Sequence, residues 1–176
     1  HKIKLGDTSF RIIQSDIQEN NLEENHRSNS FNHDGIKSNP FTVMPINHLR
    51  ELEKQKFIGS TNHRHFSLMG SILNPYKLVA NTIPEIIKIL KIDKVDIVIL
   101  IPVWPMCTQT VGLIQKSCEE NGIVSSTVSI IDELNIVLKV YRYLSVPFDL
   151  GYPLGNPTNH KEQKKIVKSL LNLIVT

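Results

Sequence analysis

Residues 95–110, VDIVILIPVWPMCTQT, decide how this chain folds. Residues 95–103 form a near-continuous apolar run, which predicts a central strand buried on both faces of a parallel sheet. Residues 108–121 follow with helical spacing, and Thr108 and Thr110 are suitable caps for that helix. Cys107 therefore lies between a strand and a helix. Parallel α/β folds place their ligands and chemistry at such points, outside the carboxyl ends of the strands.

The rest of the chain extends this pattern into an α/β domain. We expect strands at 9–13, 123–131 and 144–148, and helices at 46–56, 132–141 and 161–174. A further helix over 78–90 must kink at Pro84 or begin its second half there, because proline has no N–H to donate. We expect loops at 61–75 and 151–157. The alternation predicts a single three-layer, Rossmann-like α/β domain over residues 1–176, in which residues 1–40 are loop-rich.

Composition excludes several classes of function. Twenty basic and seventeen acidic residues give a net charge of only +3, so we expect no nucleic-acid partner. No apolar run approaches the roughly 18 residues that span a membrane, and we see no signal peptide. Two cysteines make no disulfide framework, so we expect a reducing compartment, the cytoplasm.

Cys107 is the strongest candidate for chemistry. A cysteine at a helix N-terminus feels the positive end of the helix dipole, which favours the reactive thiolate. The alternative is a packed loop cysteine, since free cysteine is often buried. Cys118 shares an apolar helix face with Val111 and Ile114, and we interpret it as a core residue. Trp104 stands where a C-x-x-C motif would have its first cysteine, so no dithiol site is present as written.

Other polar groups give weaker signals. His63 and His65, with Arg64 between them, could bind an anion or act as acid and base, or could form a solvated polar loop. The histidines lack regular ligand spacing, so we expect no metal site. No phosphate-binding glycine motif is present, and a nucleotide cofactor has no support. Gly155 and Asn156 lie in a turn-forming loop that could equally rim a pocket.

Several ordered segments resemble the family of selenoprotein B subunits from glycine, sarcosine, betaine and D-proline reductases, nearest its short, proline-reductase-like members. The most specific match is Pro105-Met106-Cys107-Thr108-Gln109-Thr110-Val111-Gly112-Leu113. The weaker matches are Gly6-Asp7-Thr8-Ser9-Phe10-Arg11, Pro45-Ile46-Asn47-His48-Leu49-Arg50-Glu51-Leu52, Phe57-Ile58-Gly59-Ser60, Phe66-Ser67-Leu68-Met69-Gly70, Val95-Asp96-Ile97-Val98-Ile99-Leu100-Ile101-Pro102-Val103 and Phe148-Asp149-Leu150-Gly151-Tyr152-Pro153-Leu154-Gly155-Asn156-Pro157. Family members usually carry a further strand before the position of Gly6, so the resemblance implies a truncated start.

The resemblance implies a site at Trp104 and Cys107. The family has selenocysteine, or cysteine in some members, at the position of Trp104. Selenocysteine is encoded by UGA, one base from the tryptophan codon UGG, and UGA is read as tryptophan in some genetic codes. Trp104 is therefore either a misread or reassigned selenocysteine codon or a true substitution. If the position belongs to selenocysteine, its side chain should lie at a pocket mouth lined by residues 59–70 and 151–157.

The resemblance also implies a function and partners. It implies a reductase subunit that cleaves a C–N bond of an amino acid or small amine with dithiol electrons. Cys107 would resolve the selenium adduct, and His63, Ser67, Gly155 and Asn156 are candidate substrate-binding residues. No cofactor is expected in this chain, but a pyruvoyl group is expected in a partner subunit of a hetero-oligomer. The alternatives are a catalytically inactive paralogue that binds or assembles, and an unrelated cysteine-dependent enzyme that acts alone.

Overall fold

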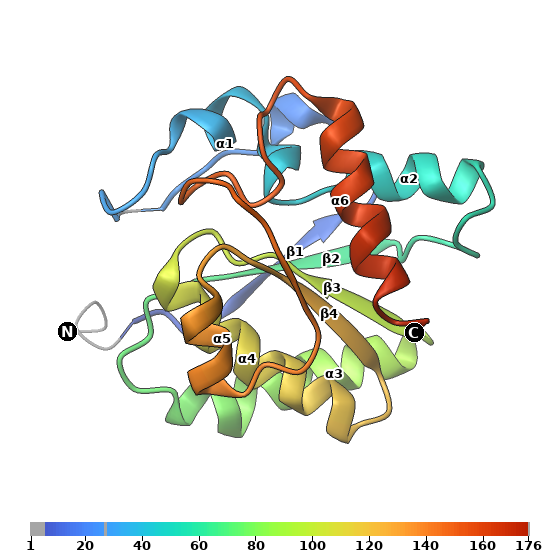
Figure 1. Ribbon diagram of the computed structural model, residues 1–176. Helices are drawn as coiled ribbons and strands as arrows, with labels where there is room; N and C mark the ends of the chain where they lie inside the picture. The colour runs from blue at the N-terminus through green and yellow to red at the C-terminus, as the bar shows by residue number, and fades with distance from the viewer. Residues whose placement is uncertain (1–5, 27, 176) are drawn as a thin grey trace.

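The computed structural model describes residues 6–26 and 28–175 and shows an α/β architecture (Figure 1). A parallel sheet with strand order β3-β4-β5 is formed by Ile97–Leu100, Val124–Ser129 and Tyr143–Ser145. A separate antiparallel pair is formed by β1, Phe10–Gln14, and β2, Arg64–Leu68. The predicted α/β class with a parallel sheet is confirmed.

Helices cover both faces of the parallel sheet (Figure 1). The larger helices are α2 Ile46–Lys54, α3 Ile83–Ile92, α4 Pro105–Glu120, α5 Asp132–Leu138 and α6 His160–Asn172. Helix α1, Asp34–Ser38, and two 3₁₀ turns, Glu19–Asn21 and Pro40–Thr42, belong to the N-terminal part. The helices α3, α4 and α5 lie below the sheet in Figure 1, and α2 and α6 lie above it. The predicted three layers are therefore helix, sheet and helix.

Two apolar cores correspond to the two faces. The first core joins α3 and α4 to one face of β3, and the rings of Phe10 and Phe66 also pack against this core. The second joins α2 and α6 to β4, with Leu52, Val128 and Leu170 almost fully buried. Burying these side chains on both sides holds the sheet between the helices, because the free energy gained grows with the apolar area removed from water.

Strand β3 differs from the sequence prediction. The regular strand covers only Ile97–Leu100 of the apolar run 95–103. It also forms an edge of the hydrogen-bonded parallel sheet, whose central strand is β4. Ile97 is consequently exposed, whereas the later residues of β3 are half-buried. The prediction of a central strand buried on both faces was wrong, because an apolar run does not reveal the order of strands in a sheet.

Two further boundaries differ. Residues 64–68 form strand β2 rather than part of a loop, and each residue pairs with one on β1, as Arg64 does with Gln14. Helix α4 begins at Pro105 and not at Thr108, with Trp104 at the N-cap position. Neither Thr108 nor Thr110 caps the helix. Proline suits the first helical position because its missing N–H would have no helical partner there.

The interpretation of Pro84 is confirmed. A π-helical turn, Leu78–Thr82, leads into α3, and Pro84 lies in the first turn of α3. The helix therefore changes its hydrogen-bond register just before the residue that has no N–H to donate.

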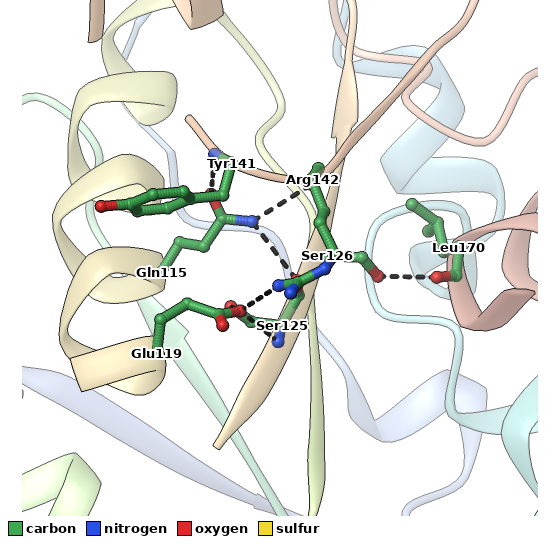
Figure 2. A network of polar contacts seen from close by, with 7 residues as sticks. All are labelled: Gln115, Glu119, Ser125, Ser126, Tyr141, Arg142 and Leu170. Atoms are coloured by element: carbon green, nitrogen blue, oxygen red, sulfur yellow. Dashed lines mark hydrogen bonds and ion pairs between the residues drawn. The ribbon is translucent and has the colours of Figure 1, made fainter. Parts of the chain in front are cut away.

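Buried polar contacts fix α4 against β4 and the start of β5 (Figure 2). The side chain of Gln115, fully buried, donates to the carbonyl of Arg142 at 3.1 Å and accepts from the N–H of Tyr141 at 2.9 Å. One turn further on, Glu119 accepts from the N–H of Ser125 at 2.8 Å and pairs with Arg142 at 2.6 Å. Because these contacts satisfy groups that would otherwise be buried unpaired, they set the position of α4 along the sheet.

Candidate functional site

The junction of β3 and α4 carries the candidate site. Trp104 occupies the N-cap position of α4, and the N–H of Cys107 donates to the carbonyl of Trp104 at 2.9 Å. Cys107 is therefore the third residue of the helix. The structure thus places residues 104 and 107 next to each other in the first turn of α4, joined by a backbone hydrogen bond.

The Cys107 thiol is half-buried, and burial raises its pKa above the ordinary value. Backbone hydrogen bonds from Val103 and Trp104, and the nearby indole of Trp104, offset part of that rise. We expected the helix dipole to favour the thiolate of Cys107, but burial is the largest effect and raises the pKa overall. The cost of moving a thiolate out of water exceeds the favourable dipole and hydrogen bonds.

Cys118 lies in the first core, as predicted, and is fully buried. Burial raises the pKa of its thiol to about 12, and the nearby Glu119 carboxylate adds to the rise. It is therefore held as a neutral thiol and serves packing.

The end of β2 covers Cys107. Gly70 follows β2, and a β-carbon built there would approach Cys107 Sγ to 2.4 Å. The hydroxyl of Thr110 donates to the carbonyl of Gly70 at 3.4 Å, and Ser71 Oγ lies 3.8 Å from Met106 Sδ. Gly70 and Ser71 therefore lie against the first turns of α4.

The loop at residues 151–157 also reaches this end of the sheet. The N–H of Gly151 donates to the carbonyl of Val103 at 2.9 Å. Gly155 and Asn156 line a groove of about 530 Å³ with residues of α1 and with Phe148 and Tyr152. Asn156 Oδ1 accepts from the backbone N–H and the hydroxyl of Thr158, each at 2.9 Å. Trp104 is not among the residues that line this groove.

Trp104 is covered by the N-terminal segment. Its ring lies 5.8 Å from the ring of His26 in an edge-to-face arrangement and 6.4 Å from the ring of Phe31. The indole N–H is buried and has no hydrogen-bond partner. The side chain of residue 104 thus lies at the expected end of the sheet, but its ring packs against His26 and Phe31, and Trp104 does not line the groove. Sequence reasoning missed these residues because residues 1–40 carry no periodic pattern.

The remaining predicted residues are not all brought together. His63 is exposed and precedes β2, at the end of that strand opposite to Gly70. Its neighbour Arg64 forms an ion pair with Asp93 at 2.5 Å, before the start of β3. Ser67 is half-buried on β2, three residues before Gly70. The structure therefore separates His63 from Cys107 by the length of β2 and keeps Ser67 on the nearer side.

Within the described residues, no group of three or more histidine, cysteine and acidic side chains is placed to hold a metal ion. In the same part of the chain, no helix combines the length and apolarity needed to cross a lipid bilayer.

The fold and the site define an α/β protein whose half-buried cysteine lies in the first turn of the helix that follows a parallel strand. Comparison with curated proteins shows which proteins the chain is similar to. It is 26% identical over 170 residues to D-proline reductase subunit gamma of Acetoanaerobium sticklandii, covering 97% of this chain and 69% of that protein. It is 29% identical over 154 residues to glycine reductase complex component B subunit gamma of Peptoclostridium acidaminophilum. It is 28% identical over 130 residues to betaine reductase complex component B subunit beta of the same organism.

These matches cover 82% and 72% of this chain, but only 34% and 29% of the glycine and betaine reductase proteins. The chain thus spans about a third of those two relatives. No family model matches the chain, and no solved structure matches it. The resemblance inferred from the motifs is confirmed: the curated relatives are subunits or components of D-proline, glycine and betaine reductase complexes.

Proposed function

We propose that this chain is a subunit of a reductase complex that cleaves a C–N bond of an amino acid or small amine of the glycine, sarcosine, betaine or D-proline type. Position 104 holds the attacking atom in this account, and Cys107 resolves the adduct. The observation that carries the proposal is the position of residues 104 and 107 at the N-cap and in the first turn of α4, where a backbone hydrogen bond joins them. The similarity to reductase subunits supports it.

The chemistry requires a selenolate or thiolate at position 104. That anion attacks the carbon of the C–N bond, the nitrogen leaves with a proton, and a carbon–selenium or carbon–sulfur bond forms. The Cys107 thiolate then attacks the selenium or sulfur, and the carbon leaves with a proton. A dithiol reduces the resulting bond between residues 104 and 107 and becomes a disulfide, so two electrons pass from dithiol to substrate.

Residues of this chain have defined tasks in that sequence. The close approach of Gly70 helps to bury Cys107, and burial raises the pKa of its thiol, which keeps the thiol protonated until the adduct is in place. Ser67 and the groove residues Gly155 and Asn156 are proposed to bind substrate. A pyruvoyl group in a partner subunit would supply the electron sink that activates the substrate amine, so a hetero-oligomer is proposed. His63 is omitted from the site, because β2 places it at the opposite end.

The experiment that tests the function begins with the coding DNA. UGA at codon 104 with a selenocysteine insertion element supports the reductase, whereas UGG contradicts activity in the natural chain. The chain with selenocysteine or cysteine at position 104 is then combined with a pyruvoyl-containing subunit. We expect dithiothreitol consumption that depends on D-proline or glycine and is lost in Cys107→Ser. Dithiol consumption that is indifferent to both substrates, or to Cys107→Ser, contradicts the proposal.

A second candidate is an inactive paralogue that binds or assembles within such a complex. The observation that favours it is the indole at position 104, which has no nucleophilic atom and packs against His26 and Phe31. Under this function the chain with Trp104 would bind the partner subunit and consume no dithiol. Codon UGG, together with partner binding in a pull-down from purified components, supports it over the reductase.

A further inference from the structure

A small polar cluster lies over position 104 and takes no part in the chemistry described so far. It consists of Glu24, His26, Ser28, Phe31 and His33, which belong to the segment that covers Trp104. The imidazole of His26 lies against both Phe31, at 4.9 Å between ring centres, and Trp104, at 5.8 Å. His26 is therefore the titratable side chain of this segment whose ring contacts residue 104.

The hydrogen bonds of His26 fix where its proton is. Its Nδ1 accepts from the backbone N–H of Ser28 at 3.1 Å. A neutral imidazole whose Nδ1 accepts must carry its hydrogen on Nε2. That Nε2 is buried and has no hydrogen-bond partner. A buried N–H donor without an acceptor is uncommon in native proteins and calls for an explanation.

The surrounding groups hold this ring in place. Glu24 Oε1 accepts from the backbone N–H of His26 at 2.5 Å, and Glu24 Oε2 pairs with His33 Nδ1 at 3.1 Å. The other ring nitrogen of His33 bonds the carbonyl of Ser28 at 2.5 Å. Phe31 stacks on His33 at 4.2 Å. These contacts hold the backbone N–H of His26. They also hold Ser28, whose own N–H selects the tautomer of the His26 ring.

Tryptophan cannot satisfy the His26 donor, because the indole N–H is itself only a donor. The Nε2–H of His26 is thus left without an acceptor beside position 104. A thiolate or selenolate at this position would be such an acceptor, and a hydrogen bond to the charged form of a group favours that form.

We propose that His26 is a catalytic residue whose Nε2–H donates a hydrogen bond to the sulfur or selenium at position 104 and stabilises its anion. This inference rests on the proposed function and adds to it the group that activates the nucleophile. Burial lowers the pKa of His26, and the positive charge of His33 acts in the same direction against the opposing Glu24 carboxylate. His26 is therefore neutral near pH 7, the state in which its two ring nitrogens have the assigned roles.

The test uses the full chain with Trp104→Cys and Cys107→Ser. The thiol introduced at position 104 is then the reactive one, because the other remaining cysteine, Cys118, is buried. The pH dependence of iodoacetamide labelling, followed by mass spectrometry, gives the pKa of the introduced thiol. We expect His26→Phe to raise that pKa by about one unit, which is roughly a tenfold loss of thiolate at pH 7. His26→Gln, which keeps an N–H donor, should restore part of it. His63→Phe, at the far end of β2, is the matched control and should change nothing.

An unchanged pKa of the introduced thiol in a folded His26→Phe variant overturns the inference. A second measurement needs no variant of His26. The ¹⁵N shifts of the His26 ring in the chain with Trp104 should report the Nε2–H tautomer, and an Nδ1–H tautomer also overturns the inference. Neither readout uses substrate or partner, so both stand if reductase activity is absent. Substrate reduction that is insensitive to His26→Phe would leave the reductase intact and remove His26 from it.

Discussion

Gly70 lies directly against Cys107. A β-carbon built on Gly70 would come within 2.4 Å of Cys107 Sγ and 2.7 Å of its Cα. The chain after β2 can therefore cross the first turn of α4 only because residue 70 has no side chain. This approach buries the thiol and is one source of the raised pKa of Cys107. The chain that follows β2 thus acts on the site through the close approach of its backbone to Cys107.

Gly70→Ala should destabilise the fold and disturb the site together. The added methyl group must displace either the Gly70 backbone or Cys107, and overpacking of this kind costs about 1–3 kcal/mol. Urea unfolding measures the loss of stability, and iodoacetamide labelling should show a faster Cys107. The matched control is Gly59→Ala, because a β-carbon at Gly59 meets nothing within 4 Å. Equal stability of the two variants would show that the close contact at Gly70 is not present in solution.

Cys107 should alkylate faster than Cys118 at neutral pH. Both pKa values are raised by burial, but Cys118 reaches about 12 and is fully buried, whereas Cys107 is half-buried and helped by backbone hydrogen bonds. Mass spectrometry after brief iodoacetamide treatment follows each cysteine on its own peptide. Labelling of Cys118 at the same rate as Cys107, or faster, would contradict the assignment of the two thiols.

The stability of the protein should fall as the pH drops from about 6.5 to about 4. His65 is largely buried, its Nε2 has no partner, and Arg50 and His63 add positive charge nearby. These causes lower its pKa from 6.5 to about 4. In this pH window the imidazole of residue 65 binds a proton in the unfolded chain but not in the folded chain. The contribution of His65 to the free energy of unfolding is therefore full above pH 6.5 and is lost as the pH falls toward 4.

The test for His65 is the slope of unfolding free energy against pH. One such group contributes at most about 1.4 kcal/mol per pH unit. His65→Phe should reduce the slope by up to that amount, while other histidines keep their own contributions in both proteins. Parallel curves for the two proteins between pH 4 and 6.5 would show that His65 is protonated equally in the folded and unfolded chain.

Periodicity in the sequence was enough to predict most of the architecture. The apolar spacing of α2, α3, α4 and α6 is strong, and each helix lies close to its predicted range. The predicted strand at 9–13 became β1, and Pro84 begins the second half of its helix. Strand β2 was missed because RHFSL has only two large apolar residues and no β-branched one. Its pairing with β1 is a contact between segments far apart in the chain, and no local pattern reports such a contact.

The site could be predicted only in part. Cys107 was found from the junction between an apolar run and a helix, and that placement depends on local sequence alone. The sign of its pKa change could not be found in this way, because it depends on Gly70 and on the burial that the tertiary fold imposes. His26 and Phe31 lie in a polar, aperiodic segment, so their contact with Trp104 has no sequence signal. His63 was expected in the pocket because residues 61–75 were treated as one loop. Strand β2 lies within that range and places His63 at the end of the strand opposite to Gly70.

The central claim is that residues 104 and 107 form a redox pair at the N-terminus of α4. The most direct test is the full chain with Trp104→Cys, oxidised and then analysed by mass spectrometry under denaturing conditions. The account predicts a reversible intramolecular disulfide between the cysteine introduced at position 104 and Cys107, reduced again by dithiothreitol. Gln109→Cys is the control, since residues two apart on a helix do not face each other and should give no such bond with Cys107. Two free thiols in oxidised, folded Trp104→Cys, or equal bonding in Gln109→Cys, would contradict the claim.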